Sequence, residues 1–509
     1  MGDVIALAVA VPLAGAAASL LAGRRRAVQR PVSIVAVATQ LALGLWMVIA
    51  TARGEILVAQ IGGWPRGVAI PLVADPFAAL MLTVGALMVL VCLVFSILAR
   101  EDVRPSFHPL VLVMSAGLAG AFLTADLFNL FVFIEVILIA SYVLLVAGAR
   151  EQVRAGVVYV LTNLLGSTLL LIGVALVYGI AGTVNLASLA SATPGTAGLR
   201  VAGGLIVLAL AVKASLVPFH GWLPTAYPQA PPAVAALFSG LLTKVGVYAM
   251  YRVVAVLFGG DAGLRPALLI AASFTMAIGV LGAVGRVRLR EILSFHITSQ
   301  VGYMIMGLGL FGPAGLAAGI FYILHHIVVK TSLFLSAGAV EEIRGTGALP
   351  RLGGLARSDR LLAAAFLISA LSLAGLPPTS GFVAKVLLVR SAFEASEFAV
   401  AAVAIAVSFL TLLSMLKIWD GAFWGEPRAT ESVAERSRRA GELVPIAGAA
   451  VEIAPLGSAR RAALAAPAAF LAAVALAIGL GGEGLLTLTG RAADGLVDVG
   501  PYVEAVLGR

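Results

Sequence analysis

Residues 213–252 read KASLVPFHGWLPTAYPQAPPAVAALFSGLLTKVGVYAMYR and place two lysines, Lys213 and Lys244, inside sequence apolar enough to cross a bilayer. A lysine at the centre of a membrane helix costs roughly 2.5–3.5 kcal/mol on insertion scales, because hydrocarbon cannot solvate its ammonium group. Pro218 cannot donate a hydrogen bond to the carbonyl of Ala214, so the helix must break soon after Lys213. Broken backbone is tolerated within a membrane where it is buried in protein or lines a wet cavity. The stretch therefore predicts an ion or proton site beside a discontinuous helix.

The composition is that of a polytopic membrane protein. Of the 509 residues, 61% are hydrophobic and only 12% are charged, and the mean hydropathy is +1.07, values that soluble domains do not approach. The net charge of +9 is scattered over short loops without a basic stripe interleaved with aromatics, which argues against a nucleic-acid partner. A single cysteine, Cys92, excludes a disulfide framework and a Cys-ligated metal site.

Hydropathy over a window of about 19 residues indicates about fourteen membrane spans. They lie near 4–22, 32–50, 74–98, 108–125, 127–147, 157–180, 201–221 (broken), 232–256, 267–284, 292–311, 315–339, 361–388 (broken), 398–419 and 463–481. Arg24–Arg26 follow the first span and no basic region precedes it, so we expect a retained helix rather than a cleaved signal. Most arginines outside the spans lie in loops after odd-numbered spans, which predicts that these loops are cytoplasmic and that both termini are outside.

The lysines are distributed differently from the arginines. Every lysine lies within or at the end of a predicted span: Lys213, Lys244, Lys330, Lys385 and Lys417. Arginine stays charged in proteins, whereas a buried lysine can lose its proton, its pKa falling by up to about 3–5 units. Genome composition is an alternative explanation for arginine in the loops, but it does not explain why lysines remain in the spans.

The predicted fold is all-α, with two five-helix repeats formed by spans 4–8 and 9–13. The fourth helix of each repeat is interrupted by proline, in LVPFHGWLP of span 7 and in GLPPTSG of span 12. An odd number of helices per repeat makes the second copy inverted, although Lys213 precedes its break whereas Lys385 follows its own. The expected divisions are 1–106 for helices 1–3, 107–258 for the first repeat, 259–420 for the second, 421–462 for a cytoplasmic loop, and 463–509 for helix 14 and a tail.

Glu135 is the one carboxylate well inside a predicted span. Unpaired, a buried carboxylate takes up a proton, but beside a lysine ammonium it stays ionised. At about 4 Å and an effective dielectric constant of about 20, such a pair interacts by roughly 4 kcal/mol, or about three pKa units. Separating the partners would then make the lysine release its proton. The alternative is a static ion pair that fixes helix packing. Asp126, at the start of the same span, fits an N-terminal helix cap.

Further polar side chains gather near Lys244 and in spans 10 and 11: Ser239, Thr243, His296, Ser299, His325, His326 and Lys330. They are too many for a lipid-facing surface, and His326 and Lys330, four residues apart, share one helix face. Imidazole titrates near neutral pH and can pass a proton between its ring nitrogens. We therefore expect a proton relay, with satisfied polar packing as the alternative. Adjacent histidines point in different directions and no carboxylate in these spans completes a site, so no metal is expected.

Three later features complete the pattern. Lys385 follows Pro378 by seven residues and is expected to face the interior of the bundle, whereas Lys417 is expected at the membrane interface. His220 is given no role. The polar loop 420–462 contains an apolar patch, VPIAGAAVEIAPLG, which suggests an interfacial helix or a partner contact.

Several motifs along nearly the whole chain resemble one known family. They are IGGWPRGVAIPLVADPFAAL at 61–80, DLFNLFVFIEVILIASYVLL at 126–145, LTKVGVYAMYR at 242–252, EILSFHITSQVGYM at 291–304, HHIVVKTSLF at 325–334 and GLPPTSGFVAK at 375–385. By these motifs, the chain is identified as a member of a family of proton-translocating membrane subunits. Respiratory complex I, membrane-bound hydrogenases and Mrp-type multisubunit cation/proton antiporters share this family. Within that family, it is most similar to the Mrp D subunits.

The resemblance implies a role for each matching residue. Glu135 resembles the family's fifth-helix glutamate, Lys213 its broken-helix lysine, Lys244 its central lysine and Lys385 its terminal lysine, while His325 and Lys330 would lie on a connecting eleventh helix. Lysine rather than glutamate at 385 departs from one complex I homologue and fits the antiporter protein. The resemblance further implies a multi-pass subunit of a bacterial inner-membrane hetero-oligomer that exchanges protons for Na⁺ or another monovalent cation, without an organic cofactor.

Two alternatives remain open at this point. The chain could belong to a redox-driven proton pump such as a complex I-like NADH dehydrogenase or a membrane-bound hydrogenase. It could also be a non-transporting scaffold in which the buried charges only specify assembly.

Overall fold

A computed structural model of the chain describes residues 2–146, 150–191, 196–261, 263–426 and 456–508. Its helices are α1 Leu7–Leu21, α2 Arg26–Ala52, α3 Pro76–Ala99, α4 Phe107–Leu123, α5 Leu127–Leu145, α6 Arg150–Ala181, α7 Leu186–Ser191, α8 Ala197–Lys213, α9 Trp222–Ala226, α10 Pro232–Phe258, α11 Leu264–Val284, α12 Leu289–Gly309, α13 Pro313–Arg344, α14 Leu355–Ser358, α15 Arg360–Ala374, α16 Ser380–Glu394, α17 Phe398–Ile418, α19 Ser458–Leu480, α20 Glu483–Val497 and α21 Gly500–Leu507. Its strands are β1 Leu57–Ile61 and β2 Ile70–Ala74.

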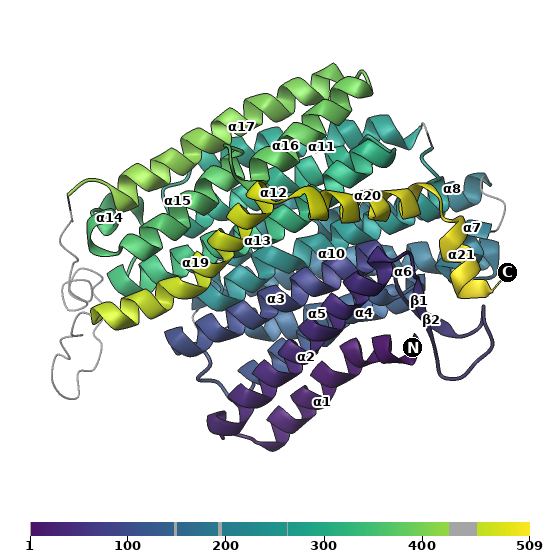
Figure 1. The fold of residues 1–509 in the computed structure, drawn as a ribbon, viewed down its shortest axis with the longest axis horizontal. Helices are drawn as coiled ribbons and strands as arrows, with labels where there is room; N and C mark the ends of the chain where they lie inside the picture. Colours follow the sequence, from purple (N-terminus) through teal and green to yellow (C-terminus); the bar gives the residue numbers. More distant parts are fainter. Residues whose placement is uncertain (1, 147–149, 192–195, 262, 427–455, 509) are drawn as a thin grey trace.

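The long helices run along one common direction and form a single bundle (Figure 1). Among the described residues, ten helices are long and apolar enough to cross a membrane, and α4 and α15 are shorter apolar helices. The chain is thus a predominantly helical, multi-pass membrane protein. Each predicted span coincides with a helix or with a broken pair of helices. Loop residues 427–455, which hold the predicted apolar patch of the 420–462 stretch, lie outside the described residues.

Both predicted helix breaks are present. Helix α8 ends at Lys213, Ser215 adopts a left-handed conformation with φ of 63°, and regular helix resumes only at Trp222. Helix α15 likewise ends at Ala374, and α16 begins at Ser380. Prolines after each end explain both interruptions, because they supply no N–H for the preceding turn. Because the helices are interrupted at these two places, α8, α15 and α16 are each shorter than the roughly 20 residues that a membrane-spanning helix needs.

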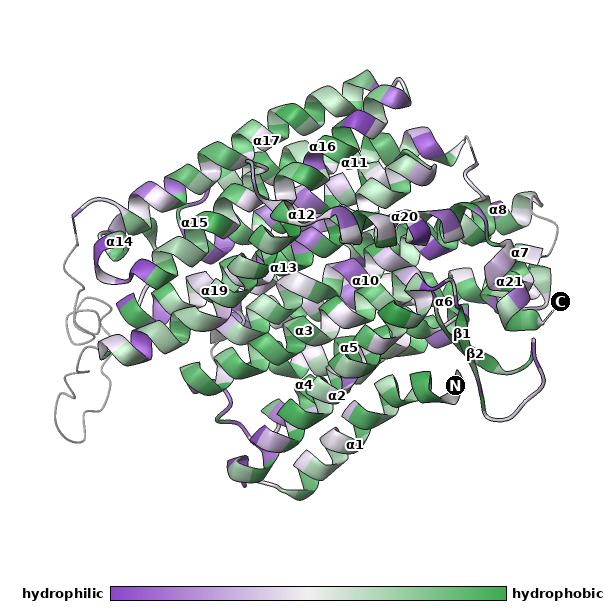
Figure 2. Cartoon of the chain, viewed as in Figure 1, coloured by the Kyte–Doolittle hydropathy of each residue, from purple (hydrophilic) through white to green (hydrophobic). Residues whose placement is uncertain are grey.

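Helices α10 and α13 lie at the centre of the bundle. Both are apolar on nearly every face and buried along their most hydrophobic stretches, as expected for helices surrounded by other helices. Hydrophilic positions nevertheless interrupt α10, α12 and α13 well inside the bundle (Figure 2). Gly240 of α10 lets the two central helices approach closely, because a Cβ there would lie 2.4 Å from Oγ1 of Thr331 on α13.

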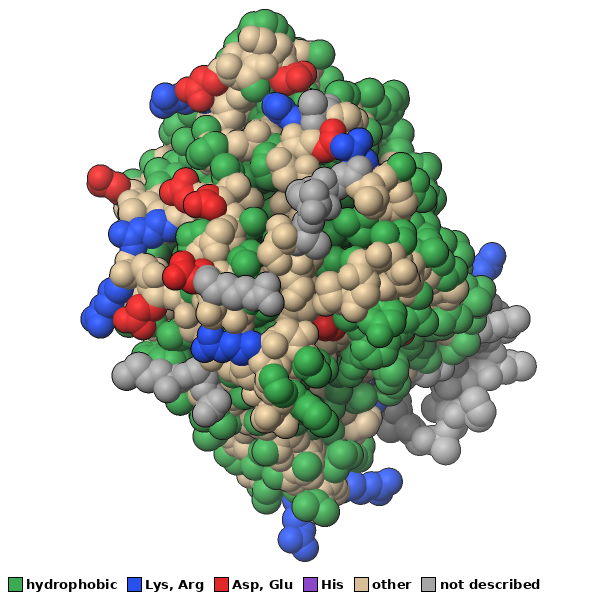
Figure 3. All heavy atoms as spheres, turned by 90° about the vertical axis from the view of Figure 1, so that its right-hand side faces the viewer, with side chains coloured by type: hydrophobic (Ala, Val, Ile, Leu, Met, Phe, Trp, Pro, Cys, Tyr) green, Lys and Arg blue, Asp and Glu red, His purple; other side chains and the backbone are tan. Residues whose placement is uncertain are grey.

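Some elements of the structure were not predicted: a β-hairpin, which departs from the all-α fold, and two helices after α19. Strands β1 and β2 form an antiparallel hairpin whose connection uses Gly62 and Gly63 at positive φ, a conformation that glycine adopts without strain. After α19, the expected tail forms α20 and α21, which pack over α13, α3 and β1. Both chain ends lie at the hairpin end of the bundle (Figure 1). That end displays acidic and basic side chains, whereas apolar side chains cover much of the flank (Figure 3).

Polar contacts hold α10 at its two ends. Near its C-terminal end, the Arg252 guanidinium makes a two-pronged, buried ion pair with Asp75, the N-cap residue of α3. At its N-terminal end, the carboxylate of Glu101 accepts a hydrogen bond of 2.9 Å from the N–H of Ala233. Since Lys244 lies between these contacts, the position of that lysine depends on both.

The Glu101 contact predicts a pH-dependent effect on stability. Burial raises the pKa of Glu101 to about 8, although the hydrogen bond from Ala233 opposes this. The raised pKa means that the folded protein holds this proton more tightly than the unfolded chain, so charging Glu101 costs stability as pH rises from about 4.3, its ordinary pKa, to about 8. Replacing Glu101 with Gln should therefore raise the thermal unfolding midpoint of the protein at pH 9 by more than at pH 6. Intrinsic tryptophan fluorescence during heating measures this midpoint.

Glu55→Gln, at an exposed position, provides the control for the Glu101 experiment. An equal effect of Glu101→Gln at both pH values would contradict the prediction.

Candidate functional site

Lys213 and Glu135 form an ion pair that a serine bridges. The Nζ atom of Lys213 lies 3.9 Å from Oε1 of Glu135, too far for a strong direct hydrogen bond. Instead, Lys213 donates to Oγ of Ser167 on α6 at 2.7 Å, and the Ser167 hydroxyl donates to Glu135. The Lys213 side chain is buried and that of Glu135 is 25% exposed, on the outer side of α5. The hydroxyl thus connects an amine and a carboxylate that the helix break brings together.

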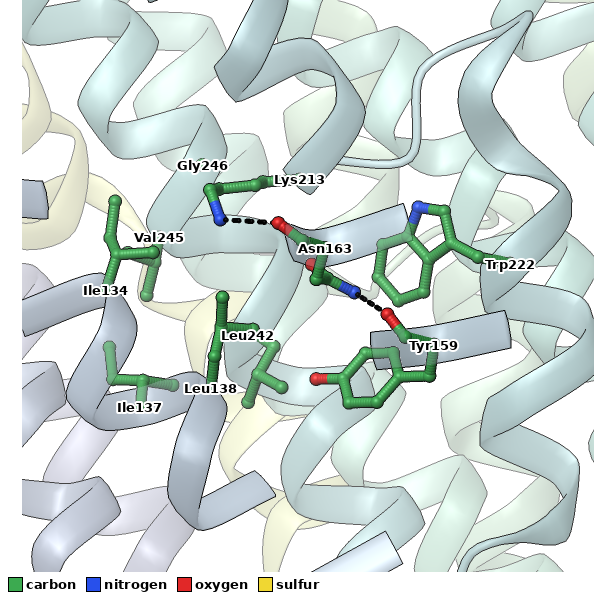
Figure 4. Close-up of a pocket in the computed structure, with 10 residues that line it drawn as sticks. All are labelled: Ile134, Ile137, Leu138, Tyr159, Asn163, Lys213, Trp222, Leu242, Val245 and Gly246. Carbon is green, nitrogen blue, oxygen red and sulfur yellow. Dashed lines mark hydrogen bonds between the residues drawn. The ribbon is translucent and has the colours of Figure 1, made fainter. Parts of the chain in front are cut away.

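A water-sized cavity lies on another side of Lys213 (Figure 4). Its volume is about 20 Å³, which is enough for one water molecule. Leu242, Val245 and Gly246 of α10 line it, on both sides of Lys244 in the sequence. The cavity lining also includes Asn163, whose carbonyl accepts a weak hydrogen bond of 3.4 Å from Lys213. Lys213 therefore lies between its carboxylate partner and the helix that carries the next lysine.

Lys244 is fully buried on α10. Its ammonium donates to the carbonyl of Ser239, one turn earlier on the same helix, while the Ser239 hydroxyl bonds to Ala236. The Oγ1 atom of Thr243, next to the lysine, is buried without a hydrogen-bond partner among the described residues. No carboxylate of the described residues pairs with Lys244 within 4.0 Å. The environment of this lysine is consequently less polar than that of Lys213.

Helix α13 contributes the next buried groups. Lys330 interacts electrostatically with Lys244, and His326 interacts with both lysines and with His325 and His296. The Nζ atom of Lys330 and both ring nitrogens of His326 are buried and form no hydrogen bond with any described residue. Buried polar groups are rarely left unpartnered, so these atoms mark a position where water would be bound.

The remaining predicted groups extend this arrangement to the second helix break. His296 bonds through Nε2 to Ser414 at 2.9 Å, and His325 bonds through Nδ1 to Ser380 at 2.8 Å. Lys385 donates to the carbonyl of Ala374 at 3.0 Å and lies 4.9 Å from the centre of the Tyr303 ring. Lys385 therefore faces the interior, as predicted.

These groups, all of them buried except the partly exposed Glu135, form a series within the bundle that we call the lysine–histidine row. Its members are Glu135, Lys213, Lys244, Lys330, His326, His296, His325 and Lys385. Six helices contribute them, so only the tertiary structure assembles the row. It contains one carboxylate among several bases, an arrangement suited to holding and passing protons.

Other predictions have different outcomes. Ser299 donates to the carbonyl of Met276 at 2.9 Å, so it contacts α11 rather than a lysine or histidine of the row. Asp126 caps α5 by accepting from the N–H of Asn129 at 2.8 Å, which confirms the capping prediction. Lys417 is half-buried near the end of α17 and donates to the backbone carbonyls of Val284 and Arg286 at the end of α11. Among the described residues, no group of three or more His, Cys, Asp or Glu side chains is placed to hold a metal ion.

A polar stripe on α6 was not predicted. Tyr159, Asn163 and Ser167 follow one another at intervals of four, so they share one face of the helix. Asn163 donates to the Tyr159 carbonyl at 2.9 Å, and the Tyr159 hydroxyl lies 2.9 Å from that of Ser141 on α5. The four-residue spacing of polar residues in an otherwise apolar span was the available signal.

His220 also belongs to a polar region that was not predicted. A cavity of about 430 Å³ extends from His220 and Gln229 to Arg286 and Glu291 at the start of α12. The Nδ1 atom of His220 is buried without a hydrogen-bond partner among the described residues. The position of His220 in a helix break was the available signal, because broken backbone within a membrane often lines a water-filled cavity.

Comparison with known proteins places the chain in a family. A family model described as NADH:quinone oxidoreductase/Mrp antiporter, TM, matches residues 124–413. The chain is 40% identical to the D subunit of the Na(+)/H(+) antiporter of Alkalihalophilus pseudofirmus and 33% identical to that of Bacillus subtilis, with both chains covered completely in each case.

Solved structures agree with this result. In the Mrp complex from Dietzia sp. DQ12-45-1b, one chain is 48% identical, with both chains fully covered and a TM-score of 0.92. A chain of respiratory complex I from Thermus thermophilus is 26% identical, with a TM-score of 0.80 over 97% of this chain and 100% of that one. The chain described here belongs to the membrane-subunit family shared by NADH:quinone oxidoreductases and Mrp antiporters.

Proposed function

We propose that this chain is the D subunit of a multisubunit Na⁺/H⁺ antiporter and that it moves protons along the lysine–histidine row. The observation that carries the proposal is that buried bases from neighbouring helices gather in the bundle. They extend from the Lys213–Ser167–Glu135 bridge, past the cavity lined by α10, to the electrostatic neighbours on α10, α13 and α16. The full-length similarity to antiporter D subunits supports the same function. Such a protein is a transporter rather than an enzyme.

The proposed mechanism uses the proton affinity of Lys213 as a switch. Beside Glu135, the ammonium is stabilised by the carboxylate and by the Ser167 hydroxyl. When the pair separates, Lys213 loses that stabilisation in a poorly solvated site and releases its proton. Lys244, Lys330 and His326 then exchange protons between α10 and α13. His325 and Lys385 continue the route to the second break.

The proposed topology has fourteen crossings and two inverted repeats. Breaks after Lys213 and Ala374 occur in the fourth helix of each five-helix group, which supports the repeats. The proposed divisions stay at 106, 258, 420 and 462, although α19 already begins at Ser458. The concentration of arginines in odd-numbered loops supports a cytoplasmic position for these loops. Since both chain ends lie at the opposite end of the bundle, they would be outside the cell, with the protein in the bacterial inner membrane.

The exposure of Glu135 supports assembly with other subunits. Its side chain is 25% exposed on a face where Phe128, Val132, Ile139 and Val143 are also exposed. A carboxylate is costly next to lipid tails, so a neighbouring protein of the antiporter complex is the expected cover of this face. The transported partners would be protons and Na⁺ or another monovalent cation.

A redox-linked proton pump is the second candidate, because chains of complex I and of an archaeal sulfane sulfur reductase share this fold at 26% identity. Adjacent genes for iron–sulfur subunits would favour the pump, whereas genes for small antiporter subunits favour the antiporter. The third candidate, a scaffold, differs from both in that removing a buried lysine would impair assembly rather than transport.

Removal of Lys244 tests the proton route. In everted vesicles containing the whole complex, Lys244→Ala should abolish Na⁺-induced dissipation of the pH gradient while the complex still assembles. The reason is that the variant deletes the only basic group of α10 that lies between Lys213 and Lys330. Lys417→Ala, at a half-buried lysine outside the row, is the matched control and should retain wild-type exchange. Normal exchange by Lys244→Ala would exclude the route, and loss of assembly alone would favour the scaffold.

Removal of the bridging hydroxyl tests the proposed switch. Ser167→Ala should slow exchange about tenfold, equivalent to roughly 1.4 kcal/mol, because Lys213 and Glu135 lose the group that connects them. The measurement is the initial rate of Na⁺-induced change in vesicle pH, normalised to assembled complex. Thr168→Val removes the neighbouring, exposed hydroxyl and should have little effect. Equal rates for the two variants would contradict a role for the bridge.

A further inference from the structure

Helix α19 packs directly against the second helix break, at residues 378–380, through Gly479. A Cβ atom at this position would lie 2.2 Å from the carbonyl oxygen of Pro378, 2.5 Å from the carbonyl carbon of Thr379 and 2.6 Å from the nitrogen of Ser380. All three are backbone atoms, which cannot move aside as the end of a flexible side chain can. Glycine is therefore the one residue that permits this approach without displacing the 378–380 segment.

The segment beneath Gly479 carries the hydrogen-bond partner of His325. Oγ of Ser380 lies 2.8 Å from Nδ1 of His325 and 3.2 Å from the Ser372 hydroxyl. The other ring nitrogen of His325, Nε2, is buried and bonds to no described residue. A hydrogen bond at one ring nitrogen fixes the orientation of an imidazole and determines what the other nitrogen can do. Ser380 thus leaves Nε2 as the atom available for proton exchange.

Charged and titratable groups surround this imidazole. Lys385 on α16 and His326 on α13 both interact with it electrostatically, and the Tyr322 ring lies 5.6 Å away, nearly perpendicular to it. A small shift of residues 378–380 would rotate the imidazole relative to all three groups. Packing of α19 therefore influences a member of the row that α19 does not itself contain.

We propose that Gly479 is a positioning residue for His325. The α19 backbone fixes the position of residues 378–380 and therefore the position of the Ser380 hydroxyl. That hydroxyl bonds to Nδ1 of His325 and leaves Nε2 available to the other members of the row. The inference rests on the proposed role of His325 in proton transfer. It assigns to α19 a part in the exchange reaction rather than in packing alone.

The experiment compares Gly479→Ala, Ser380→Ala, the double variant and His325→Ala in everted vesicles containing the whole antiporter complex. Na⁺-induced exchange is measured from about pH 6.5 to 9 and normalised to assembled complex. Gly490→Ala is the matched control, because a Cβ at Gly490 on α20 meets nothing within 4 Å. Gly479→Ala and Ser380→Ala should each lower the rate about tenfold and shift the pH profile in the same way, whereas Gly490→Ala should leave both unchanged. The double variant should be no slower than the slower single variant, since both changes break one link.

Two results would overturn the positioning role while leaving the proton route intact, provided that His325→Ala abolishes exchange. One is a wild-type rate and pH profile for Ser380→Ala, a variant that introduces no clash and so decides the question even if Gly479→Ala does not assemble. The other is a rate loss in Gly479→Ala that is the same at every pH, combined with a double variant whose rate loss is the product of the two single losses. Wild-type exchange by His325→Ala would instead overturn the proposed role of His325, and the positioning role with it.

Discussion

Desolvation of ammonium groups is the constraint on which this structure depends. Lys244 and Lys330 are fully buried on the two central helices, where lipid cannot solvate them and few protein groups bond to them. Such a position is tolerated only if neighbouring helices exclude lipid and supply polar atoms. The helices with the most polar interiors are accordingly those most completely surrounded by protein. The interior of the bundle thus contains ionisable side chains as well as a hydrophobic core.

The members of the row differ in their hydrogen-bond partners. Lys213 has a carboxylate and a hydroxyl within reach, whereas the ammonium of Lys330 has no hydrogen-bond partner among the described residues. By contrast, the ion pair of Arg252 and Asp75 is two-pronged and buried. Arginine does not lose its proton, so that pair holds α10 in place and does not exchange protons.

Helix breaks serve the same purpose at two places in the bundle. After Lys213, the break turns the chain so that α8 ends beside α6, with its lysine next to Ser167. After Ala374, the break frees a carbonyl that accepts a hydrogen bond from Lys385. At the second break, the lysine uses a backbone carbonyl that an uninterrupted helix would not offer. Gly479 of α19 lies directly against the backbone of this second break.

Local sequence was sufficient to identify the spans, both breaks and the buried lysines, because hydropathy, proline chemistry and the cost of burying charge depend on residues close together in the chain. It also located Glu135 and the cap at Asp126. The β-hairpin, α20 and α21 were not anticipated, since their stability comes from packing against distant helices. Ser167 and Ser380 could not be assigned from the sequence either. A serine in an apolar helix serves packing as readily as function, and only the approach of α8 to α6, and of α16 to α13, determines which lysine or histidine each hydroxyl contacts.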